Sequence, residues 1–413
     1  REHDLLLTEL KQDKNRIKTM KSGGRSMRNR KQKCMMACAA ILAAITVMSV
    51  LPGSQAVEKK GNETVTEVEM DYAAQEHVMP VTLLDMTNAD VQLQQTAQMA
   101  TPQANMYRSE LTNEWIDISL KNQRPVAIMV DNEKAALPHY GLTEADIVYE
   151  MMNSTANGRI TRLMAIVKDW GKITQFGSIR SVRPTNFMLA AEWNAILCHD
   201  GGPFYINQWA AKPYSNNLSG GFKRINNGKK REYTEYVCTG EIASRIQKAG
   251  FSKDYNEYYP GQHFAFSDAE IDLSIYPEAV PCTEINLSKV FPHNQTKLVY
   301  NAATNTYDYY EYGKAHTDPL HNNAQLSFKN LLIQDTTFSQ LDKNGYLIYN
   351  AIDSGRTAYY ISDGKMIPVI WIKAAENSPT IYLRLTGEPL VLNTGKTYIA
   401  LVPSDSWQNV VVK

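Results

Sequence analysis

Runs of mostly apolar residues predict strands in the first half of the chain. Residues 125–130 are short and densely apolar, which is typical of a buried strand. Residues 145–152 and 159–167 are also predicted as strands. Asn157-Gly158 lies between the second and third runs, and this pair favours the positive φ angles of a hairpin turn. We therefore expect a hairpin beside a further buried strand.

A second pattern, at residues 178–203, combines a helix start with charged and glycine residues. Pro184 suits the first position of a helix. The apolar residues that follow it, as far as Trp193, predict that this helix is buried. Residues 195–198 then form a short apolar run that predicts a strand, which ends in a His-Asp-Gly-Gly sequence.

Further along, residues 216–230 are rich in Gly, Asn and Lys and predict a mobile loop. Thr239 is placed to cap a helix at 240–249, and Gly250 is placed to end it. Strand and helix patterns thus alternate, with hairpins between some strands. This order predicts an α+β, or mixed α/β layer, domain.

The second half of the chain has a different pattern, in which short β-type runs are separated by turn signals such as Asn344-Gly345 and Asp363-Gly364. Regularly spaced short strands of this kind predict a mainly β domain, built as a sandwich or a barrel. The expected strands are 297–300, 306–312, 331–334, 346–349, 358–361, 367–372, 381–385 and 398–402.

One long apolar segment, residues 35–51, precedes all of these elements. A basic cluster lies before it at 25–33, and small residues follow it up to Ala56. This order is typical of a signal peptide cleaved after Ala56. The alternative is an uncleaved transmembrane anchor, because the segment is near the lower end of the roughly 17–25 residues that span a bilayer. Both alternatives place the rest of the chain on the outer side of the membrane.

The predicted organisation therefore has five parts. From Val57 to about Tyr107 the chain is polar and lacks periodicity, and such a stretch cannot bury enough apolar surface to fold. The parts are a basic segment at 1–33, the signal peptide or membrane anchor at 34–56, a disordered linker at 57–108, the α+β domain at 109–280 and the mainly β domain at 281–413.

Charge and cysteine content exclude some classes of protein. Lys plus Arg and Asp plus Glu number 43 each, so the net charge gives no attraction to nucleic acid. Of the five cysteines, Cys34 and Cys38 lie in the N-terminal apolar region. The folded part contains Cys198, Cys238 and Cys282, which form no CxxC pair and do not have the spacing of metal ligands. This count predicts neither a disulfide scaffold nor a zinc site. One disulfide is an open alternative, and three free thiols are favoured.

The best candidate site gathers charged residues around the helix that begins at Pro184. Arginine captures carboxylate or phosphate through two parallel hydrogen bonds, and histidine can transfer a proton near neutral pH. The alternative is that Arg180 and Arg183 pair with Glu150 or Glu192 and only hold the strands together. The predicted site consists of His199 as the catalytic candidate and of Asp131, Asn132, Glu150, Arg162, Arg180, Arg183, Gly201 and Gly202 as ligand-binding residues.

No metal or cofactor is predicted. His316 and Asp318 form an HxD pair with His321 nearby. That pattern is short and frequent, and no third ligand is spaced to complete it, so a structural turn is the expected role. HExxH, GxSxG, P-loop and dinucleotide-binding patterns do not occur in a supportive context.

Several segments resemble the bacterial YerB-like lipoprotein family, which is known as DUF3048 and has N- and C-terminal parts. The resemblance runs from about residue 110 to the end of the chain. It implies a location on the outer face of the bacterial cytoplasmic membrane and brings no established activity. The matching segments are RPVAIMVDN, GLTEADIVYE, GRITRLMAIV, IRSVRP and HDGG in the first half and YGKAHTD, SGR, DGK, WIK and LNTGKTYI in the second.

The chain departs from the resembled family in two places. Members of the family typically carry a lipid-bearing cysteine just after the apolar segment, whereas here no cysteine lies just after Leu51 and Cys38 lies at the front of the segment instead. Anchoring is therefore expected through an uncleaved helix, unless the protein is released. Pro203 stands where a serine would follow the HxGG pattern, which weakens any role for a hydroxyl group there.

Two functions are consistent with these observations. In the first, the protein is an envelope protein without catalytic activity that binds a cell-wall component or a membrane-protein partner. In the second, it is an envelope hydrolase or transferase that acts on an anionic wall substrate. Arg180 and Arg183 would then hold the anion, and His199 would act as general acid or base. The partners expected are thus a wall component or membrane protein and, through the N-terminal helix, the membrane, but no nucleic acid.

Overall fold

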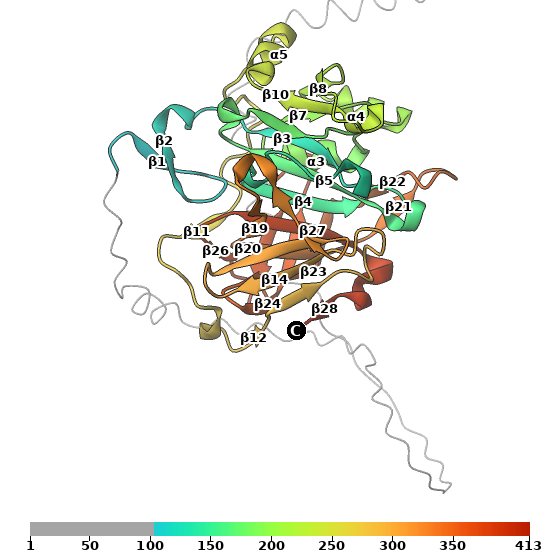
Figure 1. Cartoon of the computed structure of the whole chain (residues 1–413). Helices are drawn as coiled ribbons and strands as arrows, with labels where there is room; N and C mark the ends of the chain where they lie inside the picture. Colours follow the sequence, from blue (N-terminus) through green and yellow to red (C-terminus); the bar gives the residue numbers. More distant parts are fainter. Residues whose placement is uncertain (1–102) are drawn as a thin grey trace, which may run out of the picture. The chain divides into compact units, whose positions relative to one another are not determined.

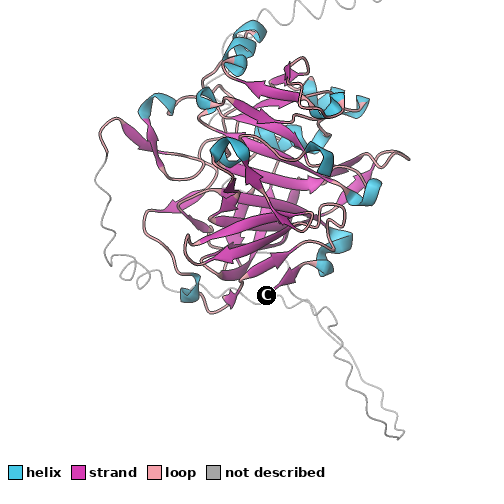
Figure 2. Ribbon diagram, in the orientation of Figure 1, coloured by secondary structure: helices cyan, strands magenta, loops and turns pink. Residues whose placement is uncertain are grey.

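The computed structural model describes residues 103–413. The segments predicted at 1–33 and 34–56, and most of the linker predicted at 57–108, lie outside these residues. The described part is mostly β with few helices (Figures 1 and 2). Among its helices, none is both long and apolar enough to cross a membrane.

A mixed eleven-stranded sheet forms the centre of the described part (Figure 1). Its strands Val126–Asp131, Ile147–Met152, Thr161–Val167 and Thr397–Pro403 are buried along their whole length, as expected where a sheet is covered on both faces. In spatial order the strands are β12 (Val280–Pro281), β24 (Lys365–Lys373), β23 (Asp353–Ser362), β20 (Asn330–Thr336), β27 (Thr397–Pro403), β4 (Ile147–Met152), β5 (Thr161–Val167), β3 (Val126–Asp131), β7 (Ile196–His199) and β8 (Asn217–Ser219), with β25 (Ile381–Arg384) beside β24.

A six-stranded sheet is formed by residues of the second half of the chain. Its strands are β16 (Lys314–Ala315), β15 (Thr306–Glu311), β14 (Lys297–Asn301), β13 (Glu284–Asn286) and β28 (Val411–Val412), with β19 (Ser327–Phe328) beside β15. A three-stranded sheet contains β6 (Gln175–Gly177), β10 (Glu235–Cys238) and β9 (Lys223–Arg224). The two-stranded sheets are β1 (Met106–Arg108) with β2 (Trp115–Asp117), β11 (Ala265–Ser267) with β26 (Val391–Asn393), β17 (Thr317–Asp318) with β18 (Ala324–Gln325) and β21 (Phe338–Gln340) with β22 (Leu347–Tyr349).

Both halves of the chain contribute to the central sheet. β27, near the end of the chain, pairs in parallel with β4, and the register runs from Thr397 opposite Ile147 to Leu401 opposite Met151. Residues of the second half therefore divide between the central sheet and the six-stranded sheet. The central sheet continues without interruption from one half of the chain to the other.

The two faces of β4 show how the layers pack. Successive side chains of a strand point to opposite faces. Tyr149 donates a hydrogen bond to Glu192, which follows helix α3 (Pro184–Ala191), over 2.6 Å. Its neighbour Glu150 accepts one from Tyr309 of β15 over 2.9 Å. The helix therefore covers one face of the sheet at β4, and the six-stranded sheet covers the other.

The predicted strands and helices are confirmed, with shifts of a few residues at their ends. Helices α3, α4 (Asn207–Ala210) and α5 (Glu241–Ala249) are short. At α5 the N-cap is Gly240 in a left-handed conformation, so the prediction that Thr239 caps this helix is wrong. The predicted loop at 216–230 contains β8 and β9. The three cysteines of the described part are free thiols.

Candidate functional site

Three of the predicted site residues meet at the end of β3. Asp131 ends this strand and lies opposite Arg162 in the register of β3 with β5. Arg162 Nη2 lies 3.4 Å from Asp131 Oδ1, and Arg180 Nε lies 3.0 Å from Asp131 Oδ2. Arg180 also reaches Glu232 over 2.6 Å. One buried carboxylate is thus shared by two arginines, of which Arg180 is the more exposed.

Arg183 joins these two arginines at the start of α3. Its side chain donates to the carbonyls of Asn153 over 3.1 Å and Val182 over 3.0 Å. The Ser181 hydroxyl accepts hydrogen bonds from both Arg162 and Arg183, which brings these two guanidinium groups together. We call Arg162, Arg180 and Arg183 the arginine cluster.

The charge of Arg183 is poorly compensated. The residue is 7% exposed, and among residues 103–413 no carboxylate lies within 4.0 Å of its guanidinium nitrogens. Burial, followed by the repulsion of Arg162, lowers the pKa of Arg183 to about 9. Tyr346 offers only the face of its ring, 4.6 Å from the guanidinium carbon. The cluster therefore combines a buried cation with an incomplete set of counter-charges.

His199 lies near the cluster in the chain but its ring makes other contacts. It ends β7, and its ring nitrogens lie 2.9 Å from the Gly201 carbonyl and 3.3 Å from the Asn217 side-chain oxygen. Burial lowers the pKa of His199. Gly201 and Gly202 are exposed, and the Gly201 carbonyl also accepts a hydrogen bond from the Val182 amide over 3.1 Å. The glycine loop thus adjoins the arginine cluster through its backbone.

Glu150 and Glu192 lie apart from the arginines, so the alternative that Arg180 and Arg183 pair with these carboxylates is wrong. Arg180 pairs instead with Asp131 and Glu232. Glu192 pairs with Lys373 over 2.9 Å. The Glu150 carboxylate accepts hydrogen bonds from four hydroxyl groups, those of Thr161, Thr296, Tyr309 and Tyr398.

A second buried polar cluster lies on the other side of Asp131. The Asp131 carbonyl lies 2.6 Å from His139 Nε2. Glu311 and His316 lie next to His139, and Glu311 Oε1 is 2.7 Å from His316 Nδ1. Burial lowers the pKa of both histidines to about 4 and raises the pKa of Glu311 to about 7. We call His139, Glu311 and His316 the His-Glu-His cluster.

Asn132 connects this second cluster with the central sheet. Its side-chain nitrogen donates to the Thr161 hydroxyl over 2.8 Å, and its side chain acts to lower the pKa of Glu311. Of the residues predicted for the site, Asn132 therefore belongs with the His-Glu-His cluster, whereas Asp131 contacts both clusters.

The HxD pattern does not bring its own residues together. Asp318 accepts hydrogen bonds from the Leu320 amide over 3.0 Å and the Thr143 hydroxyl over 2.8 Å, and His321 lies 2.9 Å from Glu144. His316 instead meets His139 and Glu311. The His-Glu-His cluster was missed because His139 is far from the other two residues in sequence. Glu311 carries no local signal either, because it ends a strand in which tyrosines and acidic residues partly alternate.

The hairpin of β21 and β22 brings Tyr346 to the arginine cluster. Gly345 precedes Tyr346 and has a φ of +81°. A Cβ atom there would lie 2.6 Å from the Ser154 hydroxyl oxygen and 2.7 Å from the Ala156 amide nitrogen. The Gly345 carbonyl also accepts the Thr155 amide over 3.0 Å. A side chain at this position would therefore push the hairpin away from residues 154–156.

Gly345→Ala is expected to lower the free energy of unfolding by about 1–3 kcal/mol, because it combines a strained φ with a backbone clash. Urea unfolding followed by tryptophan fluorescence measures this change. Gly387→Ala is the matched control, since Gly387 has a φ of +88° and nothing within 4 Å of the added Cβ. Equal losses in the two variants would contradict the close approach at Gly345.

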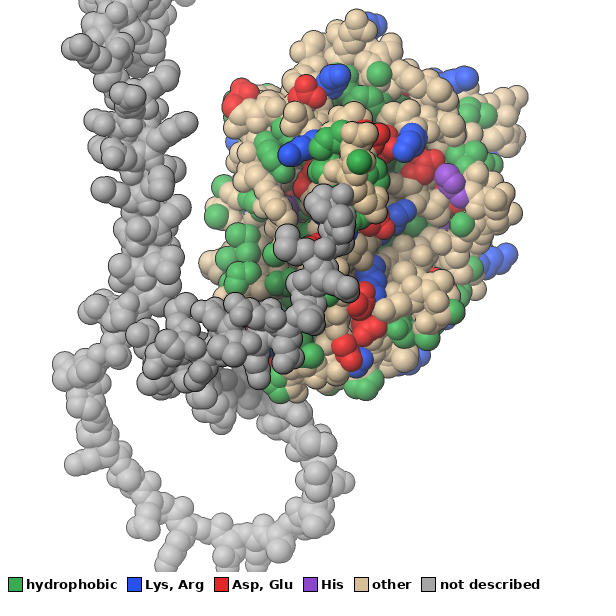
Figure 3. All heavy atoms as spheres, turned by 90° about the vertical axis from the view of Figure 1, so that its left-hand side faces the viewer, with side chains coloured by type: hydrophobic (Ala, Val, Ile, Leu, Met, Phe, Trp, Pro, Cys, Tyr) green, Lys and Arg blue, Asp and Glu red, His purple; other side chains and the backbone are tan. Residues whose placement is uncertain are grey.

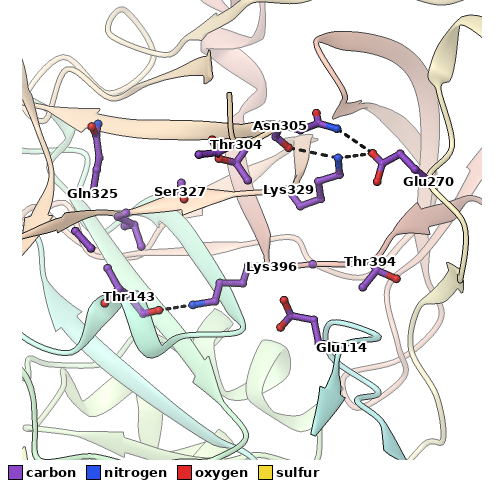
Figure 4. A pocket seen from close by; sticks show the side chains of 14 residues that line it. Glu114, Thr143, Glu270, Thr304, Asn305, Gln325, Ser327, Lys329, Thr394 and Lys396 are labelled. Atoms are coloured by element: carbon purple, nitrogen blue, oxygen red, sulfur yellow. Dashed lines mark hydrogen bonds and ion pairs between the residues drawn. The ribbon is translucent and has the colours of Figure 1, made fainter. Parts of the chain in front are cut away.

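A surface pocket of about 500 Å³ lies elsewhere, against β18, β19 and residues 394–396 (Figure 4). Its two lysines already have partners in the protein. Lys329 reaches Glu270 and lies 3.3 Å from the Asn305 carbonyl, and Lys396 reaches the Thr143 carbonyl. These contacts make this pocket a weaker anion site than the arginine cluster.

Comparison with known proteins gives a consistent result. Residues 111–252 match the N-terminal domain, and residues 287–399 the C-terminal domain, of the protein of unknown function DUF3048. The chain is 25% identical over 313 residues to the putative lipoprotein YerB of Bacillus subtilis (strain 168), which covers 75% of this chain and 87% of that protein. The crystal structure of YerB from Bacillus subtilis has the same fold, with a TM-score of 0.60 at 22% identity, over 72% of this chain and 98% of that one.

Proposed function

This chain belongs to the DUF3048, YerB-like family, and from that premise we propose that it is an extracytoplasmic envelope protein that binds an anionic group of a cell-wall component or of a membrane-protein partner. The name of the relative, a putative lipoprotein, supports an envelope location. The order of basic cluster, apolar segment and small residues at 25–56 supports export, with the chain either anchored or released.

The observation that carries the binding proposal is the uncompensated charge of Arg183. A buried cation is costly unless a counter-charge pairs with it. Arg162 and Arg180 share the single carboxylate of Asp131, and Arg183 has only carbonyl and hydroxyl acceptors. A carboxylate or phosphate group from a partner would supply the missing charge. The planar guanidinium suits such groups because it donates two parallel hydrogen bonds.

The charge distribution favours recognition of an anionic group at one place over a general attraction to nucleic acid. Acidic and basic side chains are interspersed on the face that Figure 3 shows. The whole chain has no net charge. Recognition would therefore depend on the arginine cluster rather than on a broad positive field.

The alternative, an envelope hydrolase or transferase, would use His199 as general acid or base. A general base must reach the proton that it removes. Both ring nitrogens of His199 are engaged, by Gly201 and Asn217, and its ring packs 6.0 Å from the Phe187 ring. These contacts support binding rather than proton transfer.

Binding can be tested with thermal melts of the full chain. We expect wall peptide fragments or a poly(glycerol phosphate) to raise the melting temperature of the wild type. Arg183→Met and Arg180→Met should each raise the anion concentration needed for half-saturation by about tenfold or more. The reason is that a hydrogen bond to a charged group contributes about 1.5–3 kcal/mol. Arg245→Met is the matched control, since Arg245 pairs with Glu241 outside the cluster.

The melting temperatures of the variants without ligand distinguish a binding role of the arginines from a purely structural role. Arg180 is partly exposed and Arg162 remains beside Asp131, so Arg180→Met should lower the unliganded melting temperature only slightly. If neither anion shifts the wild-type melt, and both cluster variants melt earlier without ligand, the arginines only hold the strands together and the proposal fails.

A further inference from the structure

Three segments that are distant in sequence bring the His-Glu-His cluster together. His139 follows β3 and a short 3-10 helix (Lys134–Ala136), Glu311 ends β15, and His316 lies between β16 and β17. Their exposed fractions are 0%, 2% and 3%. Each offers one ligand atom, and these atoms lie within 4.8 Å of one another. Such convergence of two imidazoles and a carboxylate inside a protein needs a physical reason, because buried polar groups are costly without partners.

Part of each polar side chain is held by the protein, and part of it is left without a partner. The Asp131 carbonyl engages His139 Nε2, and Glu311 Oε1 engages His316 Nδ1. Within the described residues, the atoms His139 Nδ1, His316 Nε2 and Glu311 Oε2 are buried and have no hydrogen-bond partner. A buried polar atom that is left without a partner destabilises the folded protein. A ligand that accepts electron pairs from the cluster would remove this cost.

We propose that His139, Glu311 and His316 bind a divalent transition-metal ion, for which Zn²⁺ is the favoured candidate. Two histidines and one glutamate form a common ligand set of zinc sites. Ca²⁺ and Mg²⁺ prefer oxygen ligands alone, so the two imidazoles disfavour them. This proposal does not rest on the anion binding proposed above, since its ligands include none of the three arginines.

The outer contacts of the cluster support this assignment. A histidine that binds a metal commonly donates its other ring N–H to a carbonyl or carboxylate, which orients the ring. The Asp131 carbonyl is in the position to do this for His139. The same Asp131 contacts Arg162 and Arg180 through its carboxylate, so a cation at the cluster and the arginine cluster would share one residue.

A surface pocket gives the cluster a route to solvent. It has a volume of about 330 Å³, and Glu311 and His316 are part of its wall, together with Lys134, Pro138 and Thr317. An ion could enter there, and water or another molecule could complete its coordination. Three protein ligands leave a position open, which is the arrangement of zinc sites that bind an exogenous ligand.

The rival explanation is a proton shared between Glu311 and His316, with no metal bound. Stoichiometric metal binding distinguishes the two. Full-length chain without an affinity tag would be treated with EDTA, dialysed and titrated with Zn²⁺ against a chromophoric chelator. We expect one equivalent of Zn²⁺ per chain, a higher melting temperature, and a visible absorption spectrum of low-symmetry Co²⁺ when Co²⁺ replaces Zn²⁺.

Variants locate the site. His139→Gln and Glu311→Gln should each weaken Zn²⁺ binding by roughly 10–100-fold or more, the range seen even for residues that support ligands. His321→Gln is the matched control, because His321 is exposed and pairs with Glu144. Circular dichroism reports whether each variant folds. If a ligand variant does not fold, the stoichiometry, melt and Co²⁺ spectrum of the wild type still decide.

Two results would overturn the proposal. The first is a wild-type chain that binds less than one equivalent of Zn²⁺ and shows no shift in melting temperature. The second is Zn²⁺ binding that is the same in folded His139→Gln and Glu311→Gln as in the wild type, because the ion would then bind at other groups.

Discussion

Lys373→Met is expected to lower the free energy of unfolding by about 3–5 kcal/mol, the loss typical when one partner of a buried ion pair is removed. Lys373 ends β24, and its Nζ lies 2.9 Å from a carboxylate oxygen of Glu192. The side chains of both residues are fully buried. Without the lysine, Glu192 keeps its charge in the interior or must take up a proton. Urea unfolding at pH 7 measures the loss.

The large loss of stability is expected because Glu192 connects several elements of the fold. Its carboxylate accepts hydrogen bonds from Tyr149 over 2.6 Å and from the amide and hydroxyl of Thr380 over 3.0 and 2.7 Å. Glu192 follows α3 and thus ties the helix to strands from both halves of the chain. The double variant Lys373→Met/Glu192→Gln is the control, since it removes both charges and should lose less stability than Lys373→Met alone.

The effect of Lys373→Met should depend on pH. Burial acts to raise the pKa of Glu192, but Lys373 and the other groups around it outweigh burial and hold that pKa below its ordinary value of 4.5. A carboxyl group with a lowered pKa in the folded state contributes stability above its unfolded pKa, and this contribution is lost as the pH falls through the folded pKa. The difference between wild type and variant should therefore shrink below about pH 4.5. A constant difference from pH 7 to pH 4 would contradict this account.

Strand positions could be predicted from the sequence because they depend on local patterns. Residues 125–130 are an apolar run and residues 159–167 are mostly apolar, and each contains a strand that is buried along its whole length. The pairing of β27 with β4 could not be predicted. Both are buried apolar strands, and nothing in either run specifies a partner from the other end of the chain. The prediction of an α+β domain followed by a mainly β domain therefore contained no sheet to which both halves contribute.

The part of the candidate site that could be predicted consists of residues at or near the ends of strands and of helix α3. Asp131 and Arg162 meet because they lie opposite each other in the antiparallel pair of β3 and β5. Arg180 and Arg183 precede α3 and reach the same place. Glu150 was predicted to lie with the arginines, but it lies apart from them. The residues of β4 on both sides of Glu150 are apolar, so the sequence has no alternation of polar and apolar residues that would indicate the face occupied by the carboxylate.

Glu150→Leu should also be strongly destabilising, by roughly 3–5 kcal/mol, because four buried hydroxyl groups would lose their acceptor at once. The hydroxyls of Thr161 and Tyr398 each lie 2.7 Å from the carboxylate, those of Thr296 and Tyr309 2.8 and 2.9 Å. They come from both sheets, so Glu150 connects the two layers. Thermal and urea unfolding of the variant measure the loss.

Glu150→Gln is the matched variant and should lose much less than Glu150→Leu, because an amide keeps one acceptor and hydroxyl groups can turn to accept its N–H. Burial raises the pKa of Glu150. An acid whose pKa is raised by folding favours the folded state at low pH and loses that contribution as the pH rises through the folded pKa. Glu150→Gln should remove this pH dependence. If Gln and Leu were equally destabilising, the four hydrogen bonds would not be what the carboxylate contributes, and the layers would be held by apolar packing alone.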